Sequence, residues 1–106
     1  MLTIIESPLF GKHWPDYWSE DERGEFVTYL AANPEAGDVI PGSGGCRKIR
    51  WAGSGKGRRG GLRIIYTARL ASGALVLLLI YSKSALENIP AHILRKIAEE
   101  LGHGEK

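Results

Sequence analysis

Residues 74–81 form an uninterrupted apolar run, Ala-Leu-Val-Leu-Leu-Leu-Ile-Tyr, which constrains the fold more than any other feature of the sequence. The run is far shorter than the roughly 18 to 20 residues that span a bilayer, so we expect a buried strand and no membrane anchor. Two segments of strand character precede it, at residues 46–51 and 62–70. Because only Ala-Ser-Gly separates the last two strands, the pattern predicts a hairpin within an antiparallel meander.

The N-terminal third of the chain predicts one strand and one helix. Residues 2–5 are apolar and rich in β-branched side chains, and a proline follows, so we expect a strand at or near a sheet edge. The aromatic cluster within residues 10–18 is expected to fold onto the core without a regular element. Ser19 and Glu22 match a capping box, which predicts the start of a helix that ends at Asn33, before a proline. The expected inner face of this helix consists of Phe26, Tyr29 and Leu30.

The remaining segments complete what we expect to be a single domain over residues 1–106. Residues 37–45 are rich in turn formers and predict a loop. Residues 52–61 alternate glycine with basic residues and predict a basic flap between two strands. A second helix is expected at residues 90–101, where one apolar stripe closes the core. These elements together predict an α+β domain.

Cysteine content and the N-terminus indicate the compartment. Cys46 is the only cysteine, so no intramolecular disulfide is possible and a reducing environment is expected. The N-terminus lacks the basic start, the apolar stretch and the small-residue cleavage site of a signal peptide. Both features predict a cytoplasmic protein.

Charge is segregated along the chain, although the net charge is only +2. Residues 1–38 contain eight carboxylates and two basic residues, whereas residues 39–86 contain nine basic residues and no acid. A positive field of this kind attracts polyanions, above all phosphate chains. A solvated basic face on an ordinary domain would show the same pattern, so charge alone leaves both interpretations open.

Four of these basic residues are expected to form one anion site. Alternation of side chains puts Lys48 and Arg50 on one face of their strand and Arg63 on one face of the next. If the apolar faces set the register, these side chains converge, and Lys83 can join them from just beyond the last strand. Such a cluster is electrostatically costly unless an anion fills it, which indicates a phosphate site. Each residue taken alone would be interpreted as a surface cation.

A site of this kind can cleave RNA without a metal ion. The ribose 2′-hydroxyl attacks its own 3′-phosphate when a base removes its proton and cations stabilise the pentacoordinate phosphate. Neighbouring cations favour the neutral form of a lysine, so Lys48 or Lys83 is the candidate base. Arg50 and Arg63 are the candidates for stabilising the transition state, and no residue is assigned as the general acid.

Other motifs in the sequence are weak. Residues 55–60 match the dinucleotide fingerprint Gly-x-Gly-x-x-Gly as a string, but a strand is expected after them where that motif needs a helix. The three histidines and Cys46 have no metal-ligand spacing, and no serine belongs to a recognisable catalytic triad. The sequence therefore implies neither a metal ion nor another cofactor.

Three segments resemble the HigB-type branch of the RelE/ParE toxin superfamily in their order and spacing. They are residues 37–51, residues 61–66 after the basic flap, and residues 77–83 (Leu-Leu-Leu-Ile-Tyr-Ser-Lys). The resemblance implies a RelE-like α+β fold, an antiparallel sheet with a mixed edge, and N-terminal and C-terminal helices packed on it. It also implies cleavage of messenger RNA on the translating ribosome and neutralisation by a cognate antitoxin protein.

The resemblance also implies which residues do the chemistry. The basic strand positions of the family match Lys48, Arg50 and Arg63, and the end of the last strand matches Lys83. These four residues are therefore expected to be catalytic. Further contacts with RNA and the ribosome are expected from Arg47, Lys56, Arg58 and Arg59.

Two other functions are considered for this chain. A ParE-like toxin has the same fold but targets DNA gyrase and is not a nuclease, and the retained basic residues argue against it. A non-catalytic RNA-binding module would grip phosphates with the cations and stack bases on Trp51 or Tyr66, but the sheet faces look too aliphatic for that role.

Overall fold

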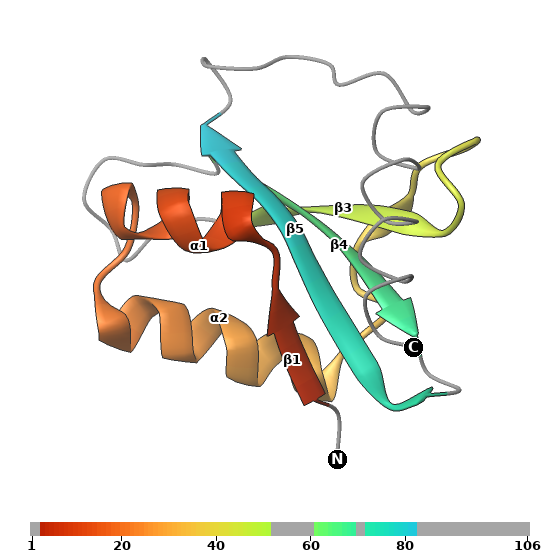
Figure 1. The fold of residues 1–106 in the computed structure, drawn as a ribbon, viewed down its shortest axis with the longest axis horizontal. Coiled ribbons are helices and arrows are strands. Elements are labelled where there is room, and N and C mark those ends of the chain that lie inside the picture. The colour runs from red at the N-terminus through yellow and green to blue at the C-terminus, as the bar shows by residue number, and fades with distance from the viewer. Residues whose placement is uncertain (1–2, 52–60, 70–71, 83–106) are drawn as a thin grey trace.

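A five-stranded sheet forms the centre of the computed structural model, which describes residues 3–51, 61–69 and 72–82. The strands are β1 (Thr3–Glu6), β2 (Asp38–Val39), β3 (Cys46–Trp51), β4 (Leu62–Arg69) and β5 (Ala74–Ser82). They lie in the order β1-β5-β4-β3-β2, as Figure 1 shows for the larger strands. β1 pairs with β5 in parallel, and every other neighbouring pair is antiparallel. The predicted meander and the mixed edge are therefore confirmed.

Two short helical elements follow β1 directly. The helix α1 spans Pro8–His13 and the 3₁₀ turn η1 spans Trp14–Asp16. The Ser7 hydroxyl caps α1 by accepting a hydrogen bond from the Phe10 backbone N–H at 3.0 Å, and it donates to the Leu78 carbonyl at 2.6 Å. The expectation that this segment lacks a regular element is therefore wrong. A capping serine with proline at the first helical position is enough to start a short helix.

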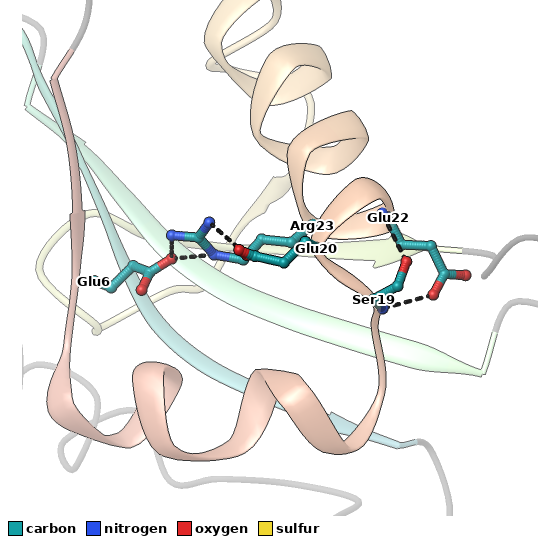
Figure 2. A network of polar contacts seen from close by, with 5 residues as sticks. All are labelled: Glu6, Ser19, Glu20, Glu22 and Arg23. Atoms are coloured by element: carbon teal, nitrogen blue, oxygen red, sulfur yellow. Dashed lines mark hydrogen bonds and ion pairs between the residues drawn. The ribbon is translucent and has the colours of Figure 1, made fainter.

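The second helix, α2, spans Glu20–Ala32 and begins at the predicted capping box (Figure 2). The Ser19 N–H donates to the Glu22 carboxylate at 2.8 Å, and the Glu22 N–H donates to the Ser19 hydroxyl at 3.2 Å. One turn further along, Arg23 forms an ion pair with Glu6 of β1. The start of α2 is therefore held both by its own cap and by the edge strand.

The inner face of α2 is only partly as expected. Phe26 and Leu30 are fully buried, whereas Tyr29 is 41% exposed. The expectation for Tyr29 is wrong because helical spacing shows which side chains share a face but not how far the covering sheet extends. The helix ends at the predicted position, where Asn33 is the C-cap.

Apolar side chains pack against both faces of the sheet. The face covered by α1 and α2 (Figure 1) carries the larger cluster, which includes Phe10, Phe26, Leu30, Ile49, Leu62, Ile64, Tyr66, Leu75 and Leu77. The opposite face carries Cys46, Ile65, Val76, Leu78 and Tyr81. The strand β5 contributes to both clusters, which confirms that the long apolar run is a buried strand.

A bulge interrupts the ladder between β4 and β5. One step along β4, from Ile65 to Tyr66, corresponds to two steps along β5, so Leu78 is an extra residue there. Towards the other end of this ladder Tyr81 lies opposite Arg63. The bulge therefore determines the register in which β5 pairs with β4, and so which residue of β5 lies opposite Arg63.

Residues 37–45, which are expected to form a loop, contain the short strand β2 and a tight turn. In the turn, the Ser43 hydroxyl donates to the Ile40 carbonyl at 2.6 Å and accepts from the Cys46 N–H at 3.0 Å. Because β2 has only two residues, it is too short to show the alternation of side chains by which a strand is predicted. The loop expectation is therefore wrong at β2 and correct for the turn.

Parts of the prediction lie outside the described residues. These are the helix at 90–101 and residues 52–60 of the basic flap. The single domain over residues 1–106 stays a prediction. In the part of the chain that the structure describes, no helix has the length and apolarity of a membrane span.

Candidate functional site

The ladder between β3 and β4 brings three of the predicted cations together. Arg50 lies directly opposite Arg63, and Lys48 shares the face of Arg50 from two residues earlier. Lys48 pairs with Ile65, which belongs to the cluster on the face away from the helices. Arg50 is exposed, whereas Lys48 and Arg63 are half-buried. These side chains therefore give that face a positive surface.

The three cations line a pocket of about 420 Å³ at the edge of the sheet. Because β2 pairs only with Arg47 and Lys48, the last residues of β3 have no further strand beside them on that side within the described chain. The polar lining of the pocket consists of Asp38, Lys48, Arg50 and Arg63, and the apolar lining consists of Tyr29, Ala36, Ile49 and Trp51. Residues from both faces of β3 therefore meet in one pocket.

Asp38 brings a carboxylate to this cationic pocket, and sequence reasoning missed it. It lies opposite Lys48 in the pairing of β2 with β3, and it is exposed. An ionised carboxylate there offsets part of the positive charge and can accept hydrogen bonds from a ligand. No local sequence signal identifies this residue, because its position depends on how the segment after α2 pairs with β3.

The apolar wall of the pocket is aromatic. The rings of Tyr29 and Trp51 lie 5.3 Å apart between centroids, at an interplanar angle of 49°. Trp51 also packs edge-on against Phe26, with centroids 5.0 Å apart. Trp51 is therefore held from behind by the core, while Tyr29 remains partly exposed beside it. Both contacts agree with the tilted and edge-on geometries that aromatic pairs prefer.

Tyr66 and Arg47 hold the segment that connects α2 to β2. The Tyr66 hydroxyl donates to the Pro34 carbonyl and accepts from the Gly37 N–H, both at 2.9 Å. The Arg47 guanidinium donates to the Gly37 carbonyl at 2.8 Å and to the Glu35 carbonyl at 3.3 Å. Burial raises the pKa of Tyr66. Arg47 does not line the pocket, and Tyr66 is fully buried and so cannot stack a base as the RNA-binding alternative expects.

Tyr81 is the neighbour of Arg63 on β5, and its side chain is buried. It lies opposite Arg63 in the ladder, is 5% exposed and does not line the pocket. Burial raises the pKa of Tyr81, and the Arg63 guanidinium lowers it by a smaller amount. The phenol is therefore neutral at physiological pH and adds no negative charge to the site.

Four predicted basic residues lie outside the described residues: Lys56, Arg58, Arg59 and Lys83. Within residues 3–51, 61–69 and 72–82, no group of three or more His, Cys, Asp or Glu side chains could hold a metal ion. The described part of the site therefore offers cations, one carboxylate and an aromatic wall. This combination can bind an anionic phosphate group next to a planar ring.

The fold is similar to those of solved bacterial toxins. The isolated RelE toxin of E. coli superimposes with a TM-score of 0.58 at 12% sequence identity, over 95% of this chain and 99% of that chain. A mutant E. coli RelE in the free state gives the same TM-score at 15% identity, over 94% and 96% of the two chains. A metal-bound toxin from Helicobacter pylori gives a TM-score of 0.51 at 21% identity, over 81% and 99%.

No protein-family profile matches the sequence. The structural likeness nevertheless extends over nearly all of the chain and nearly all of RelE. It agrees with the antiparallel sheet, its mixed edge and the N-terminal helical elements that the sequence resemblance implied. The chain therefore has the α+β fold of the RelE-like toxins.

Proposed function

We propose that this chain is the toxin of a toxin–antitoxin pair and acts as a metal-independent endoribonuclease of the HigB type. The observation that carries the proposal is the placement of Lys48, Arg50 and Arg63 in one pocket on a RelE-like fold. The substrate is messenger RNA in the translating ribosome, and the site of action is the cytoplasm. The conjunction of three cations in one pocket supports this function over that of a gyrase inhibitor, which would have the same fold.

In the proposed reaction the ribose 2′-hydroxyl attacks the adjacent 3′-phosphate. Lys48 acts as the general base that takes the 2′-hydroxyl proton, and Arg50 and Arg63 stabilise the negative charge on the pentacoordinate phosphate. The bond from phosphorus to the 5′-oxygen breaks, and that oxygen takes a proton from solvent water as it leaves. The products are a 2′,3′-cyclic phosphate and a free 5′-hydroxyl.

The remaining predicted residues have proposed roles around this centre. Lys83, which follows the last described strand in the sequence, is the alternative base. Arg47, Lys56, Arg58 and Arg59 are proposed to contact RNA or the ribosome. For Arg47 that contact would be additional to its two backbone hydrogen bonds. The antitoxin is expected to present acidic groups to this basic surface.

The test is to induce the wild-type chain in bacteria and to map the 5′ ends of cellular messenger RNA. We expect growth arrest with new 5′-hydroxyl ends inside translated frames. The Lys48→Ala/Arg50→Ala variant should lose both effects, because it lacks the candidate base and one of the two phosphate-binding arginines. Lys12→Ala, at an exposed basic residue of α1, should keep them.

Circular dichroism melting checks that each variant is folded. Arrest with intact messages and with stressed or broken DNA would instead indicate a gyrase inhibitor and would overturn the proposal. Cleavage that the double variant retains would refute the assigned site while leaving the fold assignment unchanged.

A further inference from the structure

We propose that Tyr29 and Trp51 form a stacking site for one nucleobase of the RNA whose phosphate is bound by Arg50 and Arg63. This inference rests on the proposed function and adds to it the residues that hold a base. Both aromatic residues line the same pocket as the cations. The pocket therefore offers cations for the anionic phosphate of a nucleotide and aromatic rings for its planar base, within one cavity.

The exposure of Tyr29 is the first observation in favour of this site. The side chains of Phe26 and Leu30 on the same helix are fully buried, but Tyr29 is 41% exposed and its ring is tilted against that of Trp51. Exposing a large aromatic ring to water is unfavourable, and a planar ligand that covers the ring would remove this cost. Tyr29 is therefore placed to contact a ligand and contributes less to the core than its neighbours.

The packing behind Trp51 is the second observation. Phe26 contacts Trp51 edge-on with ring centroids 5.0 Å apart, and Trp18 packs against Phe26 at 5.1 Å. Phe26 is fully buried and Trp18 is 4% exposed, so the Trp51 ring is held by a rigid support. A ring that is already fixed loses little conformational entropy when a base stacks on it.

The position of the pocket explains how both groups of one nucleotide could be reached. Trp51 follows Arg50 directly on β3, so their side chains point to opposite faces of the sheet. The two residues nevertheless line one pocket, because β2 does not extend alongside the end of β3. A nucleotide bound across this edge would place its phosphate at the cations and its base at the rings.

A nucleobase linked to a phosphate fits this pocket better than a planar group without an anionic substituent. Every nucleobase has a π-face and can stack on an aromatic ring, so the interaction tolerates different sequences. The small Ala36 side chain also lines the pocket, and Arg50 and Arg63 supply the charge for the linked phosphate. The substrate class is therefore a single-stranded RNA segment, in agreement with the proposed function.

The direct test is an NMR titration of the full chain with 2′-O-methyl RNA trinucleotides, which the 2′-hydroxyl mechanism cannot cleave. Three matched probes each lack the base at one position but keep all phosphates. We expect the Trp51 indole resonance, assigned with Trp51→Phe, to shift upfield with the complete probe. One abasic probe should bind about tenfold more weakly and should lose that shift.

Tyr29→Leu keeps an apolar side chain at an exposed position but removes the aromatic ring. It should reduce binding of the complete probe to that of the abasic probe, whereas Tyr29→Phe should behave as wild type. Leu9→Ala is the matched control, since Leu9 is 43% exposed on α1 and does not line the pocket. Equal binding of all probes, or a Trp51 resonance that never shifts, would overturn the stacking site.

The two proposals fail in different ways. If induced wild-type chain cuts messages and Tyr29→Leu cuts them at the same sites and rate, the stacking site is wrong and the nuclease function stands. If the titration shows base-dependent binding but wild type cuts no message, the nuclease function is wrong and the stacking site stands.

Discussion

Arg50 and Arg63 lie directly opposite each other on β3 and β4, and both line the same pocket. Like charges at directly opposed positions destabilise a sheet, so this pair costs the folded protein some stability. A bound anion would reverse that cost. The arrangement is therefore expected to make the stability of the protein depend on phosphate.

Inorganic phosphate should raise the Tm of the wild-type protein. At about ten times its Kd, a ligand that binds only the folded state stabilises it by about 1.4 kcal/mol, which corresponds to several degrees in a domain of this size. Arg50→Gln should reduce this phosphate-dependent shift, and Lys12→Gln should keep it. Calorimetry with chloride at matched ionic strength separates binding from screening. An equal shift in all three proteins would contradict a phosphate site at Arg50.

Tyr66→Phe should destabilise the protein clearly, although it removes only one hydroxyl group. The Tyr66 hydroxyl makes a buried hydrogen bond with the Gly37 N–H and a part-buried one with the Pro34 carbonyl, and the phenylalanine would lose both. We expect a loss of about 1 to 3 kcal/mol in the unfolding free energy measured with urea. Tyr29→Phe is the control because that side chain is 41% exposed, and it should change stability by less than about 0.5 kcal/mol.

The ion pair between β1 and α2 should contribute measurably to stability (Figure 2). The Arg23 Nε donates to Glu6 at 2.7 Å, and the Arg23 guanidinium also lies 4.9 Å from the centroid of the Trp14 ring. The two charged side chains are only 31% and 21% exposed. Glu6→Gln should therefore lower the unfolding free energy by about 1 kcal/mol. Glu25→Gln, at an exposed position of α2, should have almost no effect, and equal losses would refute the role of Glu6.

Stability should fall in the alkaline range. Burial raises the pKa of Cys46, Tyr66 and Tyr81 above the ordinary values of 9.0 for a thiol and 10.0 for a phenol. The unfolded chain then releases these protons at a lower pH than the folded protein does, so stability is full below the ordinary values and is lost as the pH rises through the folded ones. Urea unfolding between neutrality and about pH 11 measures this loss.

Removing one of the buried groups tests the origin of the alkaline effect. Cys46→Ala should make the decline begin at higher pH, because the group with the lowest ordinary pKa of the three is absent. An unchanged onset would show that the decline does not come from the Cys46 thiol. A small constant change in stability at neutral pH is expected as well, since Cys46 is fully buried.

The strands could be predicted because their apolar runs and their alternation are local properties. The cations on β3 and β4 converge for the same reason, since the apolar partners Ile49 and Ile64 define the register that places Arg50 opposite Arg63. Short elements could not be predicted in this way. The helix α1 has six residues and β2 has two, so neither shows a full period of its pattern.

Only part of the aromatic wall could be predicted, since the sequence offers Trp51 as a stacking residue in the RNA-binding alternative but its aliphatic sheet faces argue against that role. Alternation correctly separates Trp51 from Arg50, and that separation argues against a shared site. They meet only because β2 ends early and leaves the edge of β3 open, which is a property of the assembled sheet. Tyr29 and Asp38 reach the pocket from segments whose own sequences show no relation to β3.

The parallel pairing of β1 with β5 has a consequence for the order in which the protein is made. Residues 71 positions apart meet at this pair of strands, as the hydrogen bond from Ser7 to Leu78 shows. β5 is also the neighbour of β4 and is the last described strand to leave a translating ribosome. Contacts between such distant segments form late, because they require the closure of a long loop. A nascent chain therefore carries Arg50 and Arg63 well before the sheet that supports them is complete, which delays assembly of the pocket until β5 has been made.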